Sequence, residues 1–462
     1  MSLIKSISGI RGTIGGHPGE GLSPVDIVKF TAAYAQFMGK NAEGKKRTIV
    51  VGRDARVSGP MVSQLVIGTL TAMGMDVVNI GMASTPTTEI AVVGEKALGG
   101  IILTASHNPK QWNALKLLNE KGEFLNDKEG KEVLRIAEAE EFTFTDVEEL
   151  GQVYTNTTYN TRHIEQVLAL KLVDVEAIKK ANFTVAIDAV NSVGGIVIPQ
   201  LLKALGVKNI VELNCEATGK FAHTPEPIPQ NLTQISELMA QGKADVGFVV
   251  DPDVDRLAIV MENGEMFVEE YTLVSVADYI LSHTPGSTVS NLSSSRALRD
   301  VTEKHGCKYT AAAVGEVNVV TEMKRTGAVI GGEGNGGVIY PEAHYGRDAL
   351  VGVALFLTLL AKSGKTVSQL RATYPAYEIA KNKRELTPDL DVDAILCAVK
   401  ERYAGERITD IDGVKIDFAD SWVHLRKSNT EPIIRIYSEA HTMAEADALA
   451  ESIKAVIKEI AG

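Results

Sequence analysis

Cysteine is scarce in this chain, which has 462 residues and only three cysteines, Cys215, Cys307 and Cys397. The three are far apart in the sequence, and no two of them form a Cys-x-x-Cys pair. This spacing argues against a disulfide framework and against a structural zinc site. We therefore expect free thiols in a reducing compartment.

Long hydrophobic runs are also missing. The longest apolar segment extends from Ala349 to Ala361 and is too short to cross a lipid bilayer. The amino-terminal sequence MSLIKSISGIRG lacks the apolar core of a secretory signal peptide. We therefore expect a cytoplasmic protein that has no membrane partner.

Basic residues are outnumbered by acidic ones. The chain has 47 Lys and Arg residues against 59 Asp and Glu residues, which gives a formal net charge of −12. A general nucleic-acid-binding protein usually carries a basic stripe, and the sequence contains none, so we expect no nucleic-acid partner. The basic groups that bind any anionic substrate must therefore be concentrated locally.

Short β-rich runs alternate with amphipathic helical patterns through most of the chain, which predicts an α/β fold. The first helix is expected to begin at Ser23, as N-cap, and to end near Gly39, and the α/β pattern restarts twice further along. From about Tyr374 the order becomes β–α–β–β–β–α, which indicates a smaller α+β module, and the acidic stretch 138–151 is typical of a linker. We predict four domains, at residues 1–152, 153–258, 259–372 and 373–462.

The hexapeptide TASHNP (104–109) follows directly on an apolar run and so lies at the carboxyl end of a predicted strand, where α/β sheets bind ligands. The turn presents the hydroxyl of Ser106 beside His107. The chain has no G-x-S-x-G elbow here, which argues against an α/β-hydrolase. From this loop alone, a functional serine and an ordinary polar turn are equally good interpretations.

Three alternating carboxylates, Asp251, Asp253 and Asp255, occur in DPDVDR at the end of another apolar run. Carboxylates this close repel one another unless a cation compensates their charge. An EF-hand is excluded because Arg256 replaces the required glycine and an apolar stretch, LAIVM, replaces the later ligands. A small set of oxygen ligands favours Mg²⁺, and the alternative is a solvated acidic turn.

The glycine-rich segment GGEGNGG (331–337) is not a nucleotide fingerprint, because a strand-like sequence follows it where a helix would be required. Its glycines would allow Glu333 and Asn335 to project toward a small polar ligand. A carboxylate that accepts two hydroxyl hydrogen bonds would suit a sugar. A flexible turn explains the segment equally well.

The segment RKSNTEP (426–432), together with Arg435, places two arginines, two hydroxyls and several backbone amides within ten residues. Forked cationic donors, hydroxyls and N–H groups are the set that binds a phosphate dianion. The alternative is a hairpin turn with charged rims. We favour phosphate binding, because such a basic cluster stands out in an acidic chain.

Taken together, the four loops resemble the signature loops of the α-D-phosphohexomutase family. TASHNP, DPDVDR, GEGNGG and RKSNTEP occur in that order, about a hundred residues apart, and GIRG (9–12), VGRDARVSG (51–59) and STPTT (84–88) are similar to the family as well. The resemblance covers essentially the whole chain. It implies three consecutive α/β domains with mixed sheets and a C-terminal α+β domain, arranged around a central cleft.

The resemblance also implies roles for individual residues. Ser106 would carry phosphate, and a phosphate oxygen on it would complete the Mg²⁺ ligands Asp251, Asp253 and Asp255. Glu333 and Asn335 would bind sugar hydroxyls. The distant phosphate would be bound by Arg426, Ser428, Asn429, Thr430 and Arg435. The residues near the transferring group would be Arg11, Lys116, Arg256 and His107. The residue that transfers the proton is left open among His107, Lys116 and His344.

The implied function is an intramolecular phosphotransferase that interconverts 6-phospho and 1-phospho hexoses or hexosamines. It would work through a phosphoserine enzyme and a sugar 1,6-bisphosphate, which would also be the activator. The first expectation is a phosphoglucosamine mutase, and the alternative is a phosphomannomutase/phosphoglucomutase. From other classes, a Mg²⁺-dependent sugar phosphatase or a non-catalytic sugar-phosphate-binding protein remains. The partner would be a small-molecule sugar phosphate, and the chain a monomer or a homodimer.

One departure from the family bears on the sugar. Many members carry Ser and His at the positions of Asn335 and Gly337, so a histidine that often transfers the proton is missing here. The sequence does not decide which sugar the third loop recognises.

Overall fold

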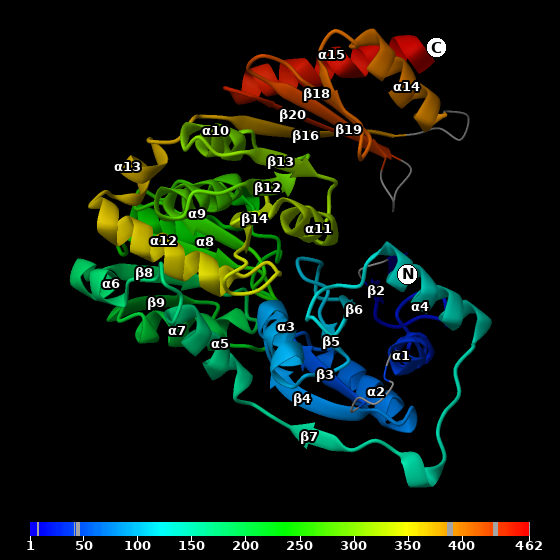
Figure 1. The fold of residues 1–462 in the computed structure, drawn as a ribbon. Helices are drawn as coiled ribbons and strands as arrows, with labels where there is room; N and C mark the ends of the chain where they lie inside the picture. Colours follow the sequence, from blue (N-terminus) through cyan, green and yellow to red (C-terminus); the bar gives the residue numbers. More distant parts are fainter. Residues whose placement is uncertain (7–8, 41, 43–46, 386–390, 428–432, 462) are drawn as a thin grey trace. The chain divides into compact units, whose positions relative to one another are not determined.

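The computed structural model describes the chain except residues 7–8, 41, 43–46, 386–390, 428–432 and 462. The chain forms two compact units. The first comprises Met1–Thr272 and Asn335–Leu370, and the second comprises Leu273–Gly334 and Arg371–Gly462. The elements of both units are labelled in Figure 1.

The first unit contains a seven-stranded mixed sheet in the order β1-β2-β6-β5-β3-β4-β7. Strands β5, β3, β4 and β7 pair parallel with one another, whereas the pairs β1–β2, β2–β6 and β6–β5 are antiparallel. The strand β7 follows the predicted boundary at residue 152 and still pairs with β4. The strands are β1 (Leu3–Ser6), β2 (Gly9–Thr13), β3 (Thr48–Arg53), β4 (Asp76–Met82), β5 (Gly99–Leu103), β6 (Trp112–Leu118) and β7 (Val153–Thr155).

Helices α1 (Pro24–Lys40), α2 (Gly59–Ala72), α3 (Thr85–Gly94) and α4 (Asp127–Ala139) pack on this sheet and on one another. The predicted cap of α1 is confirmed, since the backbone N–H of Asp26 donates to Ser23 Oγ (3.3 Å). One short 3₁₀ turn, η1 (Val147–Glu149), lies within the predicted linker.

A second sheet in this unit has the order β11-β10-β8-β9, with β11 antiparallel to β10 and the other pairs parallel. The strands are β8 (Thr184–Asp188), β9 (Asn209–Leu213), β10 (Val246–Val250) and β11 (Leu257–Val260). The associated helical segments are α5 (Tyr159–Leu168), α6 (Val175–Ala181), α7 (Gly194–Ala204), η2 (Pro229–Asn231) and α8 (Thr233–Ala240).

The longest apolar run of the sequence forms the buried helix α12 (Ala349–Ser363), which follows strand β15 (Gly337–Ile339) in the first unit. Asp348 caps this helix, because its carboxylate accepts the N–H groups of Leu350 and Val351. None of the described helices is both long and apolar enough to span a membrane.

The second unit contains strands β12 (Thr288–Asn291), β13 (Tyr309–Ala312) and β14 (Ile330–Glu333), in which β12 is parallel to both of the others. Helices α10 (Ala297–Lys304) and α11 (Glu316–Thr326) pack against them. Helices α9 (Glu269–His283) and α13 (Val367–Arg371) lie at two of the three points where the chain passes from one unit to the other, and the third lies between Gly334 and Asn335.

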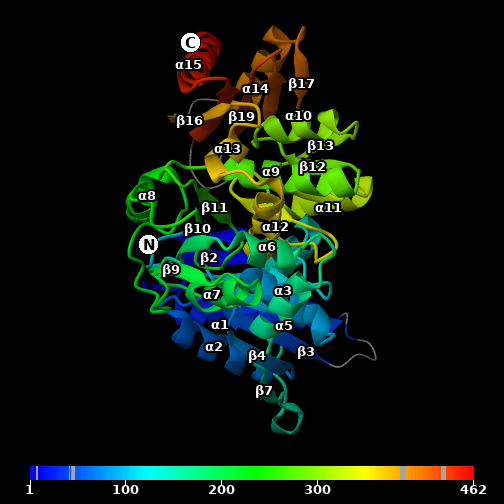
Figure 2. The same cartoon turned by 90° about the vertical axis from the view of Figure 1, so that its left-hand side faces the viewer.

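The C-terminal module is a five-stranded antiparallel sheet in the order β16-β20-β19-β18-β17. Helices α14 (Val392–Arg402) and α15 (Met443–Ala461) lie on one of its faces over a hydrophobic core (Figures 1 and 2). The predicted α+β order is confirmed, with one added short strand, β17. The strands are β16 (Glu378–Glu385), β17 (Arg407–Thr409), β18 (Val414–Asp417), β19 (Trp422–Lys427) and β20 (Ile433–Ala440).

Candidate active site

The loop that carries Ser106 is held in place by one buried arginine. The guanidinium of Arg56 donates to the backbone carbonyls of Ser106 (2.6 Å), Asn108 (2.7 Å), Pro109 (2.8 Å) and Trp112 (2.9 Å). Its charge is balanced by Asp54, to which its Nε donates at 3.0 Å, and both side chains are fully buried. Four carbonyls on one cation leave the loop little freedom.

Ser106 itself lies in a constrained conformation directly after β5. Its φ of 48° is in the left-handed region, which a non-glycine residue adopts only when its surroundings require it. Its backbone N–H donates to Thr104 Oγ1 at 3.0 Å, and Thr104 in turn donates to Asp54 at 2.7 Å. The side chain is 4% exposed, and its hydroxyl donates to Asp251 Oδ2 at 2.8 Å.

The three aspartates come together where β10 ends. Asp251, Asp253 and Asp255 are fully buried, and each offers a carboxylate oxygen within 4.8 Å of the others. The turn between them depends on Val254, whose φ of 62° is again left-handed. The backbone is strained where it brings three carboxylates to one point, which indicates a functional loop.

Cations from two distant segments partly compensate this negative charge. Lys116 Nζ lies 2.6 Å from Asp253 Oδ2 and 3.5 Å from Asp255 Oδ2, and Arg347 donates to Asp255 Oδ2 at 2.6 Å. Burial raises the pKa of Asp253, but the adjacent Lys116 ammonium outweighs it and holds that pKa below its usual range. Burial, followed by repulsion from Asp255 and Asp253, raises the pKa of Asp251 well above its usual range.

The arrangement also fits a divalent cation. Among the described residues, Asp253 Oδ1 and Asp255 Oδ1 are buried and accept no hydrogen bond. Buried carboxylate oxygens that lack a hydrogen-bond partner are costly, and a hard cation such as Mg²⁺ is bound by oxygen atoms of this kind. Asp251 Oδ2 and Ser106 Oγ, which are 2.8 Å apart, lie at the same cluster.

Three further predicted residues surround Ser106 in the first unit. Arg11 of β2 donates to Asn108 Oδ1 at 3.1 Å, and the backbone N–H of Arg256 donates to Asp251 Oδ1 at 3.2 Å. His107 Nδ1 is 3.4 Å from Ser106 Oγ. Burial, and next the charge of Arg256, lower the pKa of His107 to about 2, so its imidazole is neutral at physiological pH.

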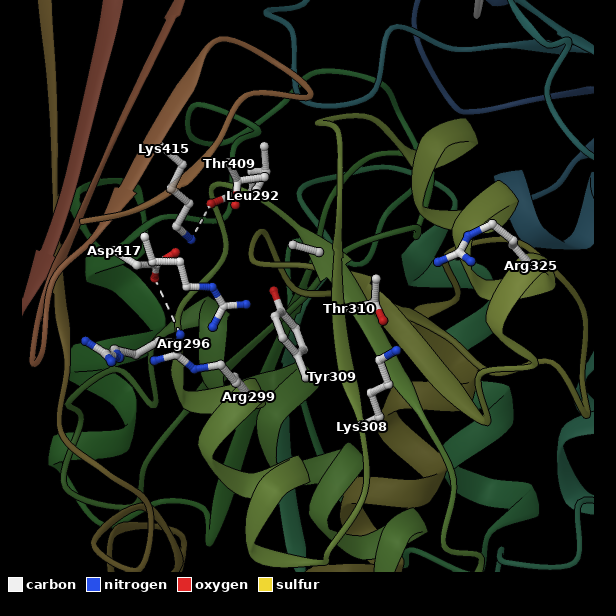
Figure 3. A pocket seen from close by; sticks show the side chains of 12 residues that line it. Leu292, Arg296, Arg299, Lys308, Tyr309, Thr310, Arg325, Thr409, Lys415 and Asp417 are labelled. Carbon is white, nitrogen blue, oxygen red and sulfur yellow. Dashed lines mark hydrogen bonds and ion pairs between the residues drawn. The ribbon is translucent and has the colours of Figure 1, made fainter. Parts of the chain in front are cut away.

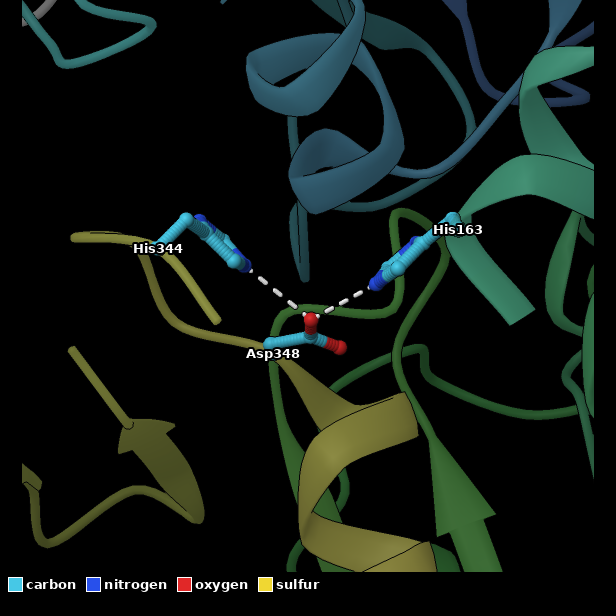
Figure 4. Close-up of side chains that lie close together, drawn as sticks. All are labelled: His163, His344 and Asp348. Carbon is cyan, nitrogen blue, oxygen red and sulfur yellow. Dashed lines mark hydrogen bonds and ion pairs between the residues drawn. The ribbon is translucent and has the colours of Figure 1, made fainter. Parts of the chain in front are cut away.

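His344, the third residue left open as proton carrier, belongs to a separate buried cluster (Figure 4). Its Nε2 lies 3.0 Å from Asp348 Oδ2, and its Nδ1 lies 3.2 Å from Glu89 Oε2. His163 Nε2 is 2.8 Å from the same oxygen of Asp348. Burial lowers the pKa of His344, but the hydrogen bonds to the two carboxylates raise it to about 10. With both nitrogens on carboxylates, His344 is not placed to take a proton from a substrate.

The sugar loop is divided between the two units. Glu333 ends β14, and its Oε1 accepts from Asn291 Nδ2 (2.8 Å) and from the N–H of Gly315 (3.3 Å) in the second unit. Asn335 belongs to the first unit, where its Oδ1 accepts from the N–H of Gly337 (3.2 Å). Gly336 is required here, because its φ is 85° and a Cβ would lie 2.4 Å from the Leu257 carbonyl oxygen.

The phosphate loop is described only at its two flanks. Arg426 of β19 and Arg435 of β20 are direct cross-strand partners, and like charges in that position are unfavourable unless an anion is near. Arg426 Nε lies 2.9 Å from Asp412 Oδ1. Ser428, Asn429 and Thr430 lie outside the described residues.

Comparison with known proteins identifies the family. Three models described as phosphoglucomutase/phosphomannomutase, alpha/beta/alpha domains I, II and III, match residues 3–144, 161–264 and 269–377, and the model of the family's C-terminal domain matches residues 379–456. The chain belongs to the phosphoglucomutase/phosphomannomutase family. The resemblance read from the four loops is thereby confirmed, as are the three α/β domains followed by an α+β domain.

Members of this family match over nearly their whole length. The phosphoglucomutase/phosphomannomutase of Thermococcus kodakarensis is 35% identical over 449 residues, which is 96% of each chain. The phosphoglucosamine/phosphogalactosamine mutase of Sulfurisphaera tokodaii is 32% identical and covers 99% of this chain and 100% of its own. A solved phosphoglucomutase/phosphomannomutase family protein from Burkholderia thailandensis has a TM-score of 0.85 at 25% identity, with 99% and 97% of the two chains covered. The chain is therefore a phosphohexomutase, an isomerase of the intramolecular phosphotransferase type.

Two supporting arginines of this phosphohexomutase were not predicted from its sequence. Arg56 lies within VGRDARVSG, a motif already similar to the family, so its position was marked although its role was not. Arg347 lies in no such motif, and only the fold brings it to Asp255. Thr85, which donates to Asp253 Oδ2 at 2.5 Å, lies in STPTT, another segment similar to the family.

Proposed function

We propose that this phosphohexomutase interconverts 6-phospho and 1-phospho hexosamines by passing a phosphoryl group through Ser106. The observation that carries the proposal is the contact of the Ser106 hydroxyl with Asp251 (2.8 Å), inside a buried trio of aspartates. An ordinary polar turn would not bury a serine against three carboxylates. The serine and the aspartates thus form one chemical unit.

The residues around Ser106 position the transferring group and neutralise its charge. Phosphoryl transfer depends on in-line placement and electrostatic stabilisation more than on covalent chemistry from the protein. Arg11, Arg256 and Lys116 supply positive charge close to the serine. Asp251, Asp253 and Asp255, with a phosphate oxygen on Ser106, would hold Mg²⁺, which when bound offsets the phosphate charge and makes the phosphoserine a better donor.

The incoming sugar hydroxyl must lose a proton as it attacks, and the serine must regain one. As a neutral base beside Ser106, His107 would accept the proton of the sugar hydroxyl, and as an ammonium Lys116 would return one to the serine. His107 is a neutral imidazole 3.4 Å away, and Lys116 is an ammonium held by Asp253 and Asp255. We assign the proton transfer to His107 and Lys116. We exclude His344, because both of its ring nitrogens contact carboxylate oxygens.

Substrate recognition is assigned to the other two loops. Glu333 and Asn335 would accept hydrogen bonds from sugar hydroxyls, and Arg426, Ser428, Asn429, Thr430 and Arg435 would bind the phosphate that is not being transferred. A sugar 1,6-bisphosphate is then the intermediate and the activator, since it can return either of its phosphates to Ser106. Neither a hydrolase nor a binding protein needs this combination of a phosphate carrier and a second phosphate clamp.

Glucosamine phosphate is the sugar we favour, and glucose or mannose phosphate is the alternative. The relative named phosphoglucosamine/phosphogalactosamine mutase supports glucosamine phosphate. The relative named phosphoglucomutase/phosphomannomutase supports the alternative.

The test is a parallel assay with glucosamine-6-phosphate, mannose-1-phosphate and glucose-1-phosphate, each primed with its own 1,6-bisphosphate. The isomerised sugar phosphate and free inorganic phosphate are measured in the same samples. The proposal expects isomerisation to exceed phosphate release, and the fastest turnover with glucosamine-6-phosphate. Phosphate release as the main product with all three sugars would identify a phosphatase and overturn the proposal.

A further inference from the structure

A cavity of about 300 Å³ lies in the second unit, beside β13 and the strands β17 and β18 (Figure 3). Its lining contains four arginines and two lysines but only one carboxylate. The chain as a whole has a net charge of −12, so this excess of positive charge is a local feature. None of the lining residues belongs to the active site proposed above. The cationic side chains are Arg296, Arg299, Lys308, Arg325, Arg407 and Lys415.

The strand pattern places four of the lining side chains on one face of the C-terminal sheet. Alternate residues of β18 belong to the hydrophobic core packed with α14 and α15, so Lys415 and Asp417 project from the opposite face. Arg407 and Thr409 of β17 are the cross-strand partners of Asp417 and Lys415. The C-terminal module therefore presents Arg407, Lys415 and Asp417 together, away from its own core.

The opposite wall comes from α10, β13 and the residue after β12. Arg299 Nη1 lies 3.4 Å from Asp417 Oδ1, and Lys415 Nζ donates to the Leu292 carbonyl at 2.8 Å. The hydroxyl of Tyr309 is 3.0 Å from Ser290 Oγ. Figure 3 shows the Arg299–Asp417 contact at one side of the cavity. The contacts of Arg299 with Asp417 and of Lys415 with Leu292 join residues 118 and 123 positions apart in the sequence, so the cavity is a defined part of the fold.

Most of the positive charge in this cavity is not balanced by carboxylates. Asp417 offsets Arg299, and Glu322 offsets Arg325 at 2.5 Å. In the part of the chain that the structure describes, Lys308, Arg407 and Lys415 form no ion pair. Among the described residues Arg296 forms no ion pair either, and such a local surplus of positive charge attracts anions.

Lys415 is the most informative of the three cations. It is 6% exposed, and its ammonium lies 4.1 Å from the centre of the Trp422 ring. Burial lowers the pKa of Lys415 to about 8. Asp417 and Glu439 counteract this lowering only in part, so burial of the ammonium stays costly, and a bound anion would offset that cost.

We propose that this cavity is a second binding site, separate from the catalytic residues, for a small phosphorylated anion held by Lys308, Arg407 and Lys415. The combination of a guanidinium with two ammonium groups suits phosphoryl oxygens. The volume lies at the lower end of ligand pockets, which favours a compact phosphate ester or pyrophosphate over a dinucleotide. The bound anion would bridge α10 and β13 to the C-terminal sheet.

Titration calorimetry with inorganic pyrophosphate tests the site on the full chain. The wild type is expected to bind pyrophosphate at two sites, one of which is the proposed catalytic phosphate loop. The double variant Lys308→Gln/Arg407→Gln should weaken only the other site, by about tenfold or more, because two charge-assisted contacts are lost. Its turnover of hexose phosphate should remain that of the wild type. Arg435→Ala should show the reverse pattern, so failure of the proposed function and failure of this inference are distinguishable.

The matched control is Lys304→Gln/Arg402→Gln, which removes the same charge from exposed positions outside the cavity. Equal weakening in the control and in the cavity variant would show general electrostatic attraction and overturn the proposal. A wild type with a single pyrophosphate site would overturn it as well. Further titrations with inorganic phosphate, a sugar 1,6-bisphosphate and a nucleoside monophosphate would show which bearer of phosphate the cavity prefers.

Discussion

Two charged regions of this chain are built in opposite ways. At the end of β10 three buried carboxylates are brought together, and the cations Lys116 and Arg347 leave two of their oxygens without a hydrogen bond among the described residues. In the cavity beside β13 cations outnumber carboxylates six to one. We propose that a metal cation completes the first region and an anion the second, since each incomplete charge balance favours a ligand of the opposite sign.

The largest effect is expected when one carboxylate of the aspartate trio is removed. We expect Asp251→Asn to reduce turnover by about a thousandfold, because one of the three proposed metal ligands is lost and removal of a key charge-stabilising group has effects of that order. In the absence of metal the same change should raise the melting temperature at neutral pH, since the raised pKa of Asp251 means that its ionised form opposes folding there. Steady-state kinetics measures the loss of turnover, and thermal unfolding with and without MgCl₂ measures the change in melting temperature. A variant that keeps the stabilisation by MgCl₂ would contradict the metal assignment.

The next largest effect is expected when the arginine that holds the Ser106 loop is replaced. Arg56→Lys loses the fork that binds four carbonyls, and we expect turnover to fall by about a hundredfold, as for a small misplacement of reacting groups. Because Asp54 would keep a poorly paired buried charge, the free energy of unfolding should fall by up to about 3–5 kcal/mol. Chemical denaturation and steady-state kinetics measure the two effects. Wild-type turnover in Arg56→Lys would show that the loop does not depend on this residue.

A smaller effect is expected for the distant phosphate clamp. Arg435→Ala should raise KM by about tenfold with a smaller change in kcat, because one charge-assisted hydrogen bond is worth roughly 1.5–3 kcal/mol. Lys383→Ala, at the cross-strand partner position on β16, is the control in the same sheet. An unchanged KM in Arg435→Ala would contradict a phosphate contact there.

The smallest effects are expected for substitutions of His344 and His107, which change stability in a pH-dependent way. The pKa of His344 is raised to about 10, so its contribution to stability is full below the unfolded pKa near 6.5 and disappears as the pH rises through 10. His344→Gln should therefore destabilise the protein at pH 6 by more than it does at pH 10. For His107 the pKa is lowered to about 2, so His107→Gln should relieve a cost of folding that grows as the pH falls below 6.5. Denaturation at several pH values measures both, and equal effects at all pH values would contradict the shifts.

The two regions also differ in how well they could be predicted from the sequence. The carboxylate loop, the serine loop and their strands were predictable, because short motifs followed apolar runs at sheet edges. The α/β order and the C-terminal module were predictable from periodicity, except for β17, whose three residues are too few to show a pattern. By contrast, Arg347 and the basic cavity arise from residues far apart in the chain, and no local pattern reveals a site that only tertiary packing assembles.

The most direct test of the central claim is phosphopeptide mapping after incubation with a sugar 1,6-bisphosphate. The account predicts one added phosphoryl group per chain, located on Ser106, and neither label nor turnover in a folded Ser106→Ala variant. Ser452→Ala, at an exposed serine of α15, should behave as the wild type. Phosphate on another residue, or full turnover by Ser106→Ala, would contradict the role of Ser106 as the phosphate carrier.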